Sequence, residues 1–488
     1  MPERDPLSGP DNAWRRMGQI DNLMTITGIL WFDEQVGYEQ LCERLEERLL
    51  YFDRFSQRIG GRKRRFRRPY WETVEDFDIE THVYDISLPE PADDEAFQRF
   101  VGRLMSRPLD ERRPLWEAYL IEDVDKGDGN AVAVRLNHSI ADGFALLYVL
   151  LGLADDPHAI DLPIGELPLP PNFQRPSSGE DAGPAVNQER VSGQSTTATE
   201  TATARETRPG SRSDSGSSPD ESPSLTDGPF GAVGAAAGLA SGAYGLLTMG
   251  NEPDVSLRND LGTRKRAGWT DRIDLDRVKE LKQQYDATVN DVLLGVTAGA
   301  LRRELEERGE ATDGVEIRCT VPVNLVPMRE RGETLGNEFG LAFIPLPVGV
   351  EPLDERIQRI RDEATPRKVG IEAFLMYKLL QVGGYVPEIV QQQVMKFFED
   401  RATGIVTNVP GPMETFELAG AEVTDMVFWV PQAIDQGLGI SLFTYDNSVR
   451  IGIASDDNVL SDPSRLANHF AAEIEMLEAE LERIEQAE

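Results

Sequence analysis

Hydrophobic residues recur along this chain with two periods, that of a helix and that of a strand. In residues 38–51 apolar side chains recur every three or four positions, which predicts a helix. The side chains of residues 131–137 alternate with a period of two, which predicts a strand. A second helix is predicted at 141–154, directly after that strand. The first part of the chain therefore predicts a fold that mixes strands and helices.

The C-terminal part repeats this mixture. Its predicted elements are a helix at 289–307, strands at 315–323 and 340–347, and a hairpin at 438–455. The hairpin should turn at Asp446-Asn447, because these residues tolerate the backbone of a tight turn. A last helix is predicted to begin with Asp462 as its cap and Pro463 in its first position, and to end near Gln486. No internal repeat of fixed period is visible, and both parts predict α/β sandwiches of similar size.

The polar segment 172–228 separates these two parts. It is rich in Ser, Thr, Gly, Pro and acidic residues and nearly lacks large apolar side chains, so we expect a disordered linker. The following residues, 229–250, carry no charge and are mostly Gly, Ala and Ser, which favours a helix near the domain junction over a membrane span. The predicted domains are therefore 1–171 and 251–488.

The net charge of the chain is strongly negative. Its 488 residues hold 85 Asp and Glu against 50 Lys and Arg, for a formal charge of −35, and only 8 of the basic residues are Lys. An acidic surface poor in Lys is typical of a halophile's protein, since concentrated salt screens the self-repulsion. The same charge argues against nucleic acid as a partner.

One basic run interrupts the acidic chain, formed by Arg58, Arg62, Lys63, Arg64, Arg65, Arg67 and Arg68. It is either a solvated loop or a dock for an anionic surface or for coenzyme phosphates. The two cysteines, Cys42 and Cys319, lie far apart and exclude a disulfide framework and a cysteine-built zinc site. Because the first residues lack the apolar core of a signal peptide, we expect a cytoplasmic protein.

The chain has four histidines, and one of them stands out. His138 follows the predicted strand 131–137 and precedes a predicted helix, in the run Asn-His-Ser-Ile-Ala-Asp-Gly. Functional groups often lie where a strand ends, and neutral His is the usual general base near pH 7. Asp142, four residues later, can hold the loop through backbone amides. His82, His158 and His469 are more typical of structural or solvated positions.

Residues 137–143 resemble the HHxxxDG signature of coenzyme-A-dependent acyltransferases related to chloramphenicol acetyltransferase and to peptide-synthetase condensation domains. Further motifs resemble those of one family, the bifunctional wax ester synthase/diacylglycerol acyltransferases. They are Pro-Leu-Trp-Glu at 114–117, Asn290-Asp291, Gly336-Asn337, Thr-Asn-Val-Pro-Gly-Pro at 407–412, and the segment 77–83. Their order and spacing identify the chain as a member of this family over most of 1–171 and 250–488.

The resemblance implies two chloramphenicol acetyltransferase-like α/β domains with an active-site tunnel between them. In such enzymes His138 would take the proton of an alcohol as its oxygen attacks the thioester of acyl-CoA. The products would be a wax ester from a long-chain alcohol, or triacylglycerol from diacylglycerol, together with CoA. Acyl-CoA is a co-substrate, and the resemblance implies no metal and no further cofactor.

It also implies supporting roles for other motif residues. Asp142 would be structural, and Gly143 would let the chain turn tightly beside the tunnel. The pair Asn290-Asp291 would support the site or simply cap a helix. Thr407 and Asn408 would line the substrate tunnel, and Trp116 would either line it or pack in the core.

Asn137 departs from the signature, because the family usually has His at this position. Asn can donate and accept hydrogen bonds but cannot be protonated, so we expect the activity class to survive with a changed rate or substrate preference. If the host is a haloarchaeon, its core lipids would be isoprenoid ethers, and diacylglycerol need not be the acceptor.

Two other functions remain open from the sequence. The same scaffold could acylate another alcohol, such as a terpenoid, a polyketide or a carrier-bound substrate. A non-catalytic lipid-binding scaffold is the alternative of a different class, although the joint presence of His138, Asp142 and Gly143 speaks against it. A lipid product would bring the protein to a membrane or lipid-droplet surface, on the inner face of the membrane.

Overall fold

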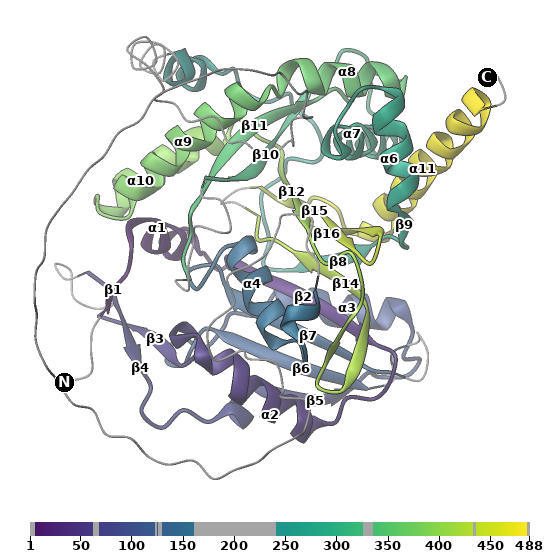
Figure 1. Ribbon diagram of the computed structural model, residues 1–488. Coiled ribbons are helices and arrows are strands. Elements are labelled where there is room, and N and C mark those ends of the chain that lie inside the picture. Colours follow the sequence, from purple (N-terminus) through teal and green to yellow (C-terminus); the bar gives the residue numbers. More distant parts are fainter. Residues whose placement is uncertain are drawn as a thin grey trace, which may run out of the picture. The chain divides into compact units, whose positions relative to one another are not determined.

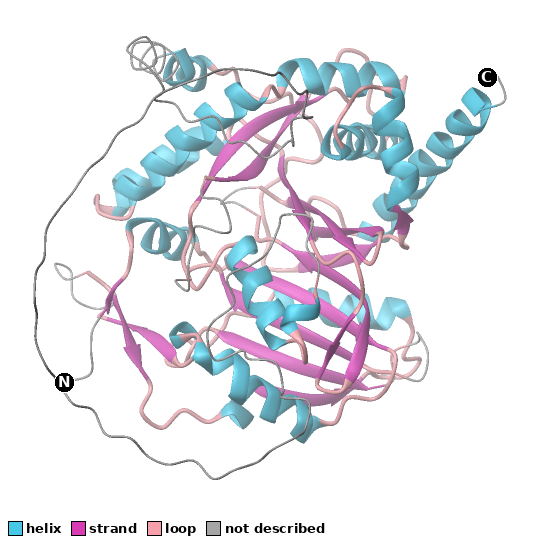
Figure 2. Cartoon of the chain, viewed as in Figure 1, coloured by secondary structure: helices cyan, strands magenta, loops and turns pink. Residues whose placement is uncertain are grey.

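Two mixed β-sheets with helices on their faces carry the fold (Figures 1 and 2). The structure, a computed structural model, describes residues 5–61, 68–122, 124, 129–160, 241–325, 335–432 and 436–485, and all these ranges belong to one unit. The predicted linker 172–228 lies outside the described residues, as do 229–240. Residues 241–248 are helical.

The first sheet has six strands in the order β13-β14-β2-β7-β6-β5. The strands are β2 (Thr25–Phe32), β5 (Val83–Ser87), β6 (Trp116–Glu122), β7 (Ala131–Asn137), β13 (Phe416–Leu418) and β14 (Ala421–Trp429). Successive side chains of β2 face opposite sides: Leu30 packs with helices α2 (Tyr38–Arg48) and α4 (Gly143–Leu153), whereas Ile29 packs with α3 (Asp94–Met105). The sheet is therefore buried on both faces.

The second sheet has seven strands in the order β11-β10-β12-β15-β16-β8, with β9 beside β16. Its strands are β8 (Lys265–Trp269), β9 (Ile273–Asp274), β10 (Ile317–Asn324), β11 (Phe339–Leu346), β12 (Gly404–Pro410), β15 (Leu438–Tyr445) and β16 (Ser448–Asp456). Strand β12 runs parallel to β10 and β15, and the other pairs are antiparallel. Its core packs against α6 (Leu275–Gln284), α7 (Val289–Glu307), α8 (Leu353–Glu363) and α11 (Pro463–Glu485).

The first sheet takes two of its strands from the C-terminal part of the chain. Strand β14 comes from the C-terminal part of the chain but pairs antiparallel with β2 of the first sheet, with Met426 opposite Leu30 (Figure 1). Its neighbour β13 extends the first sheet further. The predicted C-terminal domain, 251–488, therefore supplies two strands of the N-terminal sheet. The sequence did not predict this arrangement.

A third group of elements lies beside β11. Helix α1 (Gly9–Met17) packs against α9 (Pro366–Gly383) and α10 (Glu388–Glu399), and their apolar side chains form one buried cluster with β11. The N-terminal part of the chain also forms a small three-stranded sheet, in the order β1 (Asp5–Pro6), β4 (Tyr70–Thr73) and β3 (Gln57–Gly60). Single 3-10 turns occur at Leu49–Tyr51, Asp53–Phe55, Ile79–Thr81 and Pro157–Ala159.

Several predicted elements are confirmed. Strand β7 and helix α7 have the predicted bounds, and the hairpin β15–β16 turns at Asp446 and Asn447, whose φ angles are 44° and 48°. The cap of α11 forms as predicted, since the Ser464 amide donates to the Asp462 carboxylate at 3.1 Å. None of the described helices is both long and apolar enough to cross a membrane.

Candidate active site

His138 lies in the short loop between β7 and α4 (Figure 1). Its backbone amide donates to the Met24 carbonyl at 2.9 Å, which anchors the loop to the start of β2. The side chain is 6% exposed. The histidine is therefore fixed at a strand end, as the sequence predicted, and is shielded from bulk water.

Aromatic rings cover the imidazole. The Trp14 ring from α1 stacks on it with a centroid separation of 4.7 Å and an interplanar angle of 13°. Phe339, at the start of β11, lies 5.5 Å away and also stacks on Trp14. Burial is the main cause that lowers the pKa of His138 below 6.5, because desolvation disfavours the imidazolium. The ring is therefore held in its neutral, basic form.

Asn337 fixes which nitrogen of His138 carries the hydrogen. Its Nδ2 lies 2.9 Å from the His138 carbonyl oxygen and 2.8 Å from Asp11 Oδ1, so both amide hydrogens have acceptors. The Asn337 Oδ1 then faces His138 Nδ1 at 2.8 Å and must accept from it. Nδ1 therefore carries the hydrogen, and Nε2 keeps the lone pair that a general base needs.

Asp11 is the far end of this chain of hydrogen bonds. It lies in the first turn of α1, whose cap is Ser8, and is 4% exposed. Burial raises the pKa of Asp11, while hydrogen bonds from Asn337 and Ser8 oppose that shift. The carboxylate thus holds the Asn337 amide in its orientation. Because Asp11 is buried, keeping it ionised costs free energy.

Asp142 joins the two halves of the site. One carboxylate oxygen accepts from the Ala145 amide at 3.0 Å and caps α4, while the other accepts from the Glu338 amide at 3.0 Å. The Asp142 amide in turn donates to the Gly336 carbonyl at 3.2 Å. The two sequence motifs 137–143 and 336–337 are therefore bonded to each other, and Asp142 holds the loop through backbone amides.

Asn137 closes the loop through local hydrogen bonds, whereas Gly143 does not adopt the tight turn expected of it. The Asn137 Oδ1 accepts from the Ser139 amide at 3.0 Å and its hydroxyl at 2.7 Å, so the side chain closes the loop. Gly143 has no left-handed backbone, and a Cβ there would meet only Val409, at 3.8 Å. The expected need for a tight turn at Gly143 is therefore wrong.

A second group of predicted residues meets at the start of α7. Thr288 and Asp291 form a reciprocal capping box, with the Thr288 amide 2.9 Å from the Asp291 carboxylate. The Asn408 amide donates to the Asn290 side chain at 3.3 Å. Asp291 is thus a helix cap, and Asn290 is bonded to a neighbouring strand. Thr407, next to Asn408 on β12, is buried and points to the opposite face of the sheet.

Two spaces adjoin the first turn of α4. A pocket of about 540 Å³ is lined by Phe144, Asn290, Asn408 and, among others, Lys279 and Lys282. A smaller cavity of about 160 Å³ is lined almost wholly by apolar side chains and by Gly143. Gly143 and Phe144 are consecutive, so the start of α4 lies between the two spaces. His138 lines neither of them.

Trp116 lies in the core of the first sheet and also lines the smaller cavity. It is 3% exposed, and its Nε1 donates to the Phe55 carbonyl at 2.8 Å. The His82 ring lies 5.0 Å from it, and burial lowers the pKa of that histidine. Trp116 is therefore a core residue that also borders a cavity, and its place in a substrate tunnel stays a prediction.

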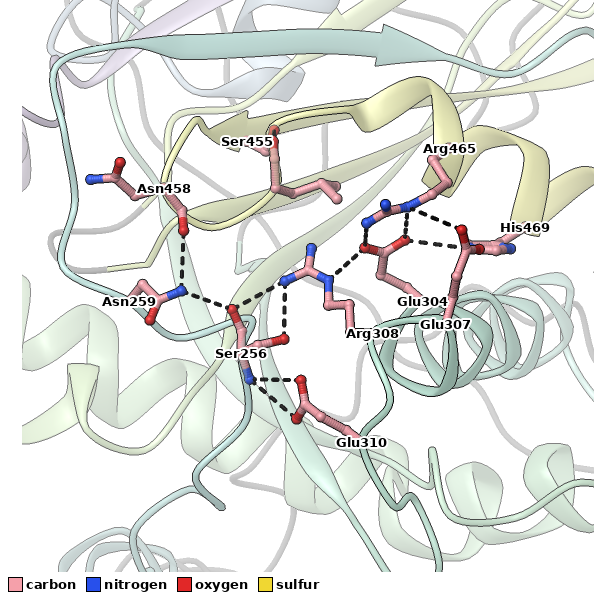
Figure 3. A network of polar contacts seen from close by, with 11 residues as sticks. Ser256, Asn259, Glu304, Glu307, Arg308, Glu310, Ser455, Asn458, Arg465 and His469 are labelled. Carbon is pink, nitrogen blue, oxygen red and sulfur yellow. Dashed lines mark hydrogen bonds and ion pairs between the residues drawn. The ribbon is translucent and has the colours of Figure 1, made fainter.

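The remaining histidines lie elsewhere. His158 is exposed in a 3-10 turn, and its backbone amide donates to Asp156 at 3.1 Å. His469 of α11 faces Glu304 at 3.4 Å and Glu307 at 3.1 Å within a network of charged side chains (Figure 3). The His138 ring, by contrast, faces the side-chain amide of Asn337 and stacks with Trp14.

The sequence interpretation missed Asp11 and Trp14 as members of the site, and it named Asn337 only as a motif residue. Asp11 and Trp14 are 127 and 124 residues away from His138 along the chain, and only tertiary packing brings them together. The residues that the structure describes hold no group of three or more His, Cys, Asp or Glu side chains suited to a metal ion.

Comparison with family models gives two matches. The model described as the wax ester synthase/diacylglycerol acyltransferase catalytic domain matches residues 7–293, and the one described as the WS/DGAT C-terminal domain matches residues 335–478. The two ranges together include every residue of the His138 site.

Curated relatives and solved structures agree with these matches. A putative diacylglycerol O-acyltransferase of Mycobacterium tuberculosis is 30% identical over 84% of this chain and 83% of its own. A probable one from the same species is 25% identical over 88% and 85%. The structure of a wax ester synthase/diacylglycerol acyltransferase from Marinobacter aquaeolei superposes with a TM-score of 0.64 at 19% identity, covering 98% and 99% of the two chains. A condensation domain of the calcium-dependent antibiotic synthetase has a TM-score of 0.55 at 15% identity, with 97% and 95% covered.

Proposed function

Since the chain belongs to the wax ester synthase/diacylglycerol acyltransferase family, we propose that it transfers a fatty acyl group from acyl-CoA to diacylglycerol or to a long-chain alcohol. The observation that carries the proposal is the orientation of His138. Its Nδ1 is bonded to the Asn337 oxygen at 2.8 Å, which leaves Nε2 as a base in a buried, aromatic setting.

In the proposed reaction, His138 Nε2 accepts the proton of the acceptor hydroxyl while the hydroxyl oxygen attacks the thioester carbonyl carbon. The tetrahedral oxyanion then collapses, the carbon–sulfur bond breaks, and the CoA sulfur leaves with the electron pair. The imidazolium returns its proton to that sulfur. General base catalysis contributes about 10²–10⁴-fold, and positioning of the two substrates contributes the rest together with oxyanion stabilisation.

Other residues support this step without touching the reacting atoms. Asn337 holds the tautomer of His138, and Asp142 fixes the loop by bonding α4 to residue 338. The Asn137 side chain bonds Ser139 rather than the imidazole, so the departure from the family signature leaves the base itself intact. Hence we expect acyl transfer despite Asn137.

We assign the two spaces beside α4 to the substrates. The pocket of about 540 Å³ suits coenzyme A, because Lys279 and Lys282 on its wall can meet phosphate and Asn290 and Asn408 can bond its amides. The apolar cavity of about 160 Å³, walled by Gly143 and Trp116, suits part of an acyl chain. Thr407 lies on the face of β12 that also carries Val409, a wall residue of that cavity.

We also propose the setting in which this enzyme works. The charge of −35 and the low Lys content support a cytoplasm rich in salt. Two free, buried cysteines, Cys42 and Cys319, are compatible with reducing conditions. The hydrophobic acceptor and product support work at the inner face of a membrane or at a lipid droplet.

The test is release of CoA thiol from palmitoyl-CoA, in molar KCl, with and without diacylglycerol or hexadecanol. We expect the wild type to release thiol only with an acceptor, and His138→Ala to be slower by two orders of magnitude or more. His158→Ala, an exposed histidine outside the site, is the matched control and should keep wild-type rates. Equal rates for His138→Ala and wild type would end the proposal.

A further inference from the structure

The apolar cavity beside α4 adjoins a gap in the face of strand β2. Alternate residues of a strand share a face, so β2 directs Ile26, Gly28 and Leu30 toward the cavity, and all three line it. Ile26 and Leu30 are each 5% exposed, whereas Gly28, which lies between them, is partly exposed. The space of about 160 Å³ therefore adjoins the position where one large side chain of β2 is missing.

The residues paired with Gly28 share its exposure. Val134 of β7 and Phe428 of β14 lie opposite Gly28 on its two sides, and Figure 1 shows these three strands as neighbours. We call these three residues the Gly28 row. All of them line the cavity and are partly exposed. The rows on either side are buried and consist of Ile26 with Leu136, and of Leu30 with Val132 and Met426. The opening in the sheet therefore centres on Gly28.

Helix α4 forms the opposite wall of the cavity. Its residues Gly143, Leu146 and Leu150 are three and four positions apart, so they lie on one face of the helix. All three line the cavity, and all three are partly exposed. The cavity thus lies between the Gly28 row and one face of α4.

Both walls begin at the loop that carries His138. The His138 amide is bonded to the Met24 carbonyl, directly before β2, and α4 begins at Gly143. Gly28 lies about 13 Å along the strand from Met24. Phe144 of the same first turn lines the pocket that we assign to coenzyme A. The acyl group of a bound acyl-CoA, rather than the acceptor, is therefore next to the entrance of this cavity.

The backbone gives no reason for glycine at position 28. A glycine inside a strand weakens it and offers no side chain to pack. Gly28 has no left-handed φ angle, and a Cβ there would approach Phe428 and the Val427 carbonyl no closer than 3.7 Å. Room for a ligand is the remaining reason, because glycine inside a strand often marks a place where a ligand approaches the backbone.

We propose that Gly28 sets the length of the acyl chain that this protein accepts. The inference rests on the proposed function, which assigns the cavity to the acyl chain, and it adds the residue that limits how far the chain enters. An apolar cavity of about 150 Å³ takes up a benzene-sized molecule, so this one has room for about six carbon atoms. The end of the acyl chain lies against the Gly28 backbone, between Val134 and Phe428.

Thiol release from a series of donors, from hexanoyl-CoA to stearoyl-CoA with hexadecanol as acceptor, tests this inference. A Leu side chain would fill the space of about four methylene groups. In Gly28→Leu we therefore expect kcat/KM to fall by about tenfold or more with palmitoyl-CoA and to change little with hexanoyl-CoA. Gly28→Ala should shift the preference in the same direction by less. Gly250→Leu is the matched control and should keep the wild-type preference, because Gly250 is exposed and lines neither substrate space.

Melting curves distinguish a ligand site from a gap in the packing. Gly28→Ala and Gly28→Leu should melt no lower than wild type, since each replaces a glycine inside a strand and fills apolar space. Palmitoyl-CoA should raise the melting temperature of wild type more than that of Gly28→Leu, and this readout needs no turnover. If Gly28→Leu melts lower, Gly28→Ala decides the question, because its Cβ meets only ordinary contacts.

Three results would overturn the inference. They are an unchanged donor preference in folded Gly28→Leu, an equal loss with every donor, and a changed preference that appears only when the acceptor is varied from hexanol to hexadecanol. Wild type that releases no thiol with any donor would remove the proposed function alone. In that case, equal melting shifts with palmitoyl-CoA in wild type and Gly28→Leu would overturn the role of Gly28, and a smaller shift in the variant would support it.

Discussion

This protein has two clusters of polar side chains, each around a different histidine. They differ in whether the buried carboxylate of the cluster is bonded to cations. At His138, the hydrogen-bond partner is the neutral amide of Asn337, and aromatic rings fill the remaining space. At His469, the partners are carboxylates, and the buried one, Glu304, is bonded to two arginines (Figure 3). In the part of the chain that the structure describes, no arginine or lysine is bonded to the Asp11 carboxylate of the first cluster, on which Arg54 acts only through its charge, whereas two arginines donate to Glu304 in the second.

The second cluster is arranged for stability. Arg308 and Arg465 donate to the Glu304 carboxylate at 2.7 and 2.9 Å. Burial alone would raise the pKa of Glu304, but these bonds outweigh it and hold the pKa below its usual value. Helices α7 and α11 are thereby joined through a carboxylate that stays ionised. None of its members adjoins the two spaces beside α4.

The first cluster gives up stability for orientation. Burial raises the pKa of Asp11, and the hydrogen bonds from Asn337 and Ser8 offset only part of that shift. The carboxylate nevertheless directs the Asn337 amide and so selects the His138 tautomer. A strained ionisable group next to a buried imidazole is typical of catalytic sites, whereas charges matched one to one are typical of folding contacts.

The largest effect should come from cutting the link between Asn337 and His138. We expect Asn337→Ala to lower kcat by about 100-fold, the lower end of what a general base contributes, because the ring then loses its fixed tautomer. The measurement is thiol release at saturating substrate. KM should change by less than threefold, since Asn337 lines neither substrate space. A drop confined to KM would contradict the positioning role.

A pH profile separates positioning from mere support of the fold. In the wild type, burial lowers the pKa of His138, so the base stays neutral and the acid limb of kcat/KM falls below pH 6.5. In Asn337→Asp, a carboxylate facing Nδ1 favours the imidazolium and should move that limb to higher pH. An unmoved limb in Asn337→Asp would show that residue 337 does not govern the base.

The sequence predicted the elements on which His138 depends better than it predicted the residues around it. Strand β7 follows from local periodicity and is confirmed, whereas the helix predicted at 141–154 begins at Gly143, because Asp142 is its cap. The contact between residues 137–143 and 336–338 spans about 200 positions, so no local pattern could reveal it. The motifs identified the participants but not their bonds.

The pairing of β14 with the first sheet shows the same limit on a larger scale. Its alternation is compatible with a strand in either sheet, and only pairing with β2 decides between them. Trp14 is similar, because a Trp on a short helix is usually a core residue. It serves that role here and also covers the catalytic imidazole.

A smaller effect is expected at the compensated cluster. Glu304→Gln removes the charge that two arginines face, and we expect the free energy of unfolding at pH 7 to fall by about 2 kcal/mol. The acyl-transfer rate of the folded protein should not change. Chemical denaturation in urea measures the loss. Glu307→Gln, whose side chain is 52% exposed, is the control and should change stability by less than about 0.5 kcal/mol.

The smallest effect is the sharpest test of the comparison, because its sign differs between the clusters. Glu304 has a lowered folded pKa, so its stabilisation is present above the unfolded pKa and is lost as pH falls through the folded pKa. The stability gap between wild type and Glu304→Gln should therefore close on acidification.

Asp11 should behave in the reverse sense. Its folded pKa is raised, so the native state binds the proton more tightly, and stability falls as pH rises from the unfolded pKa to the folded one. Asp11→Asn keeps an oxygen acceptor for Asn337 and removes the charge. It should be more stable than wild type at pH 7, by up to about 1 kcal/mol, and equal to it below the unfolded pKa. Melting curves across this pH range measure both variants. A destabilised Asp11→Asn at neutral pH would mean that the carboxylate is compensated after all, and that the two clusters differ in position but not in kind.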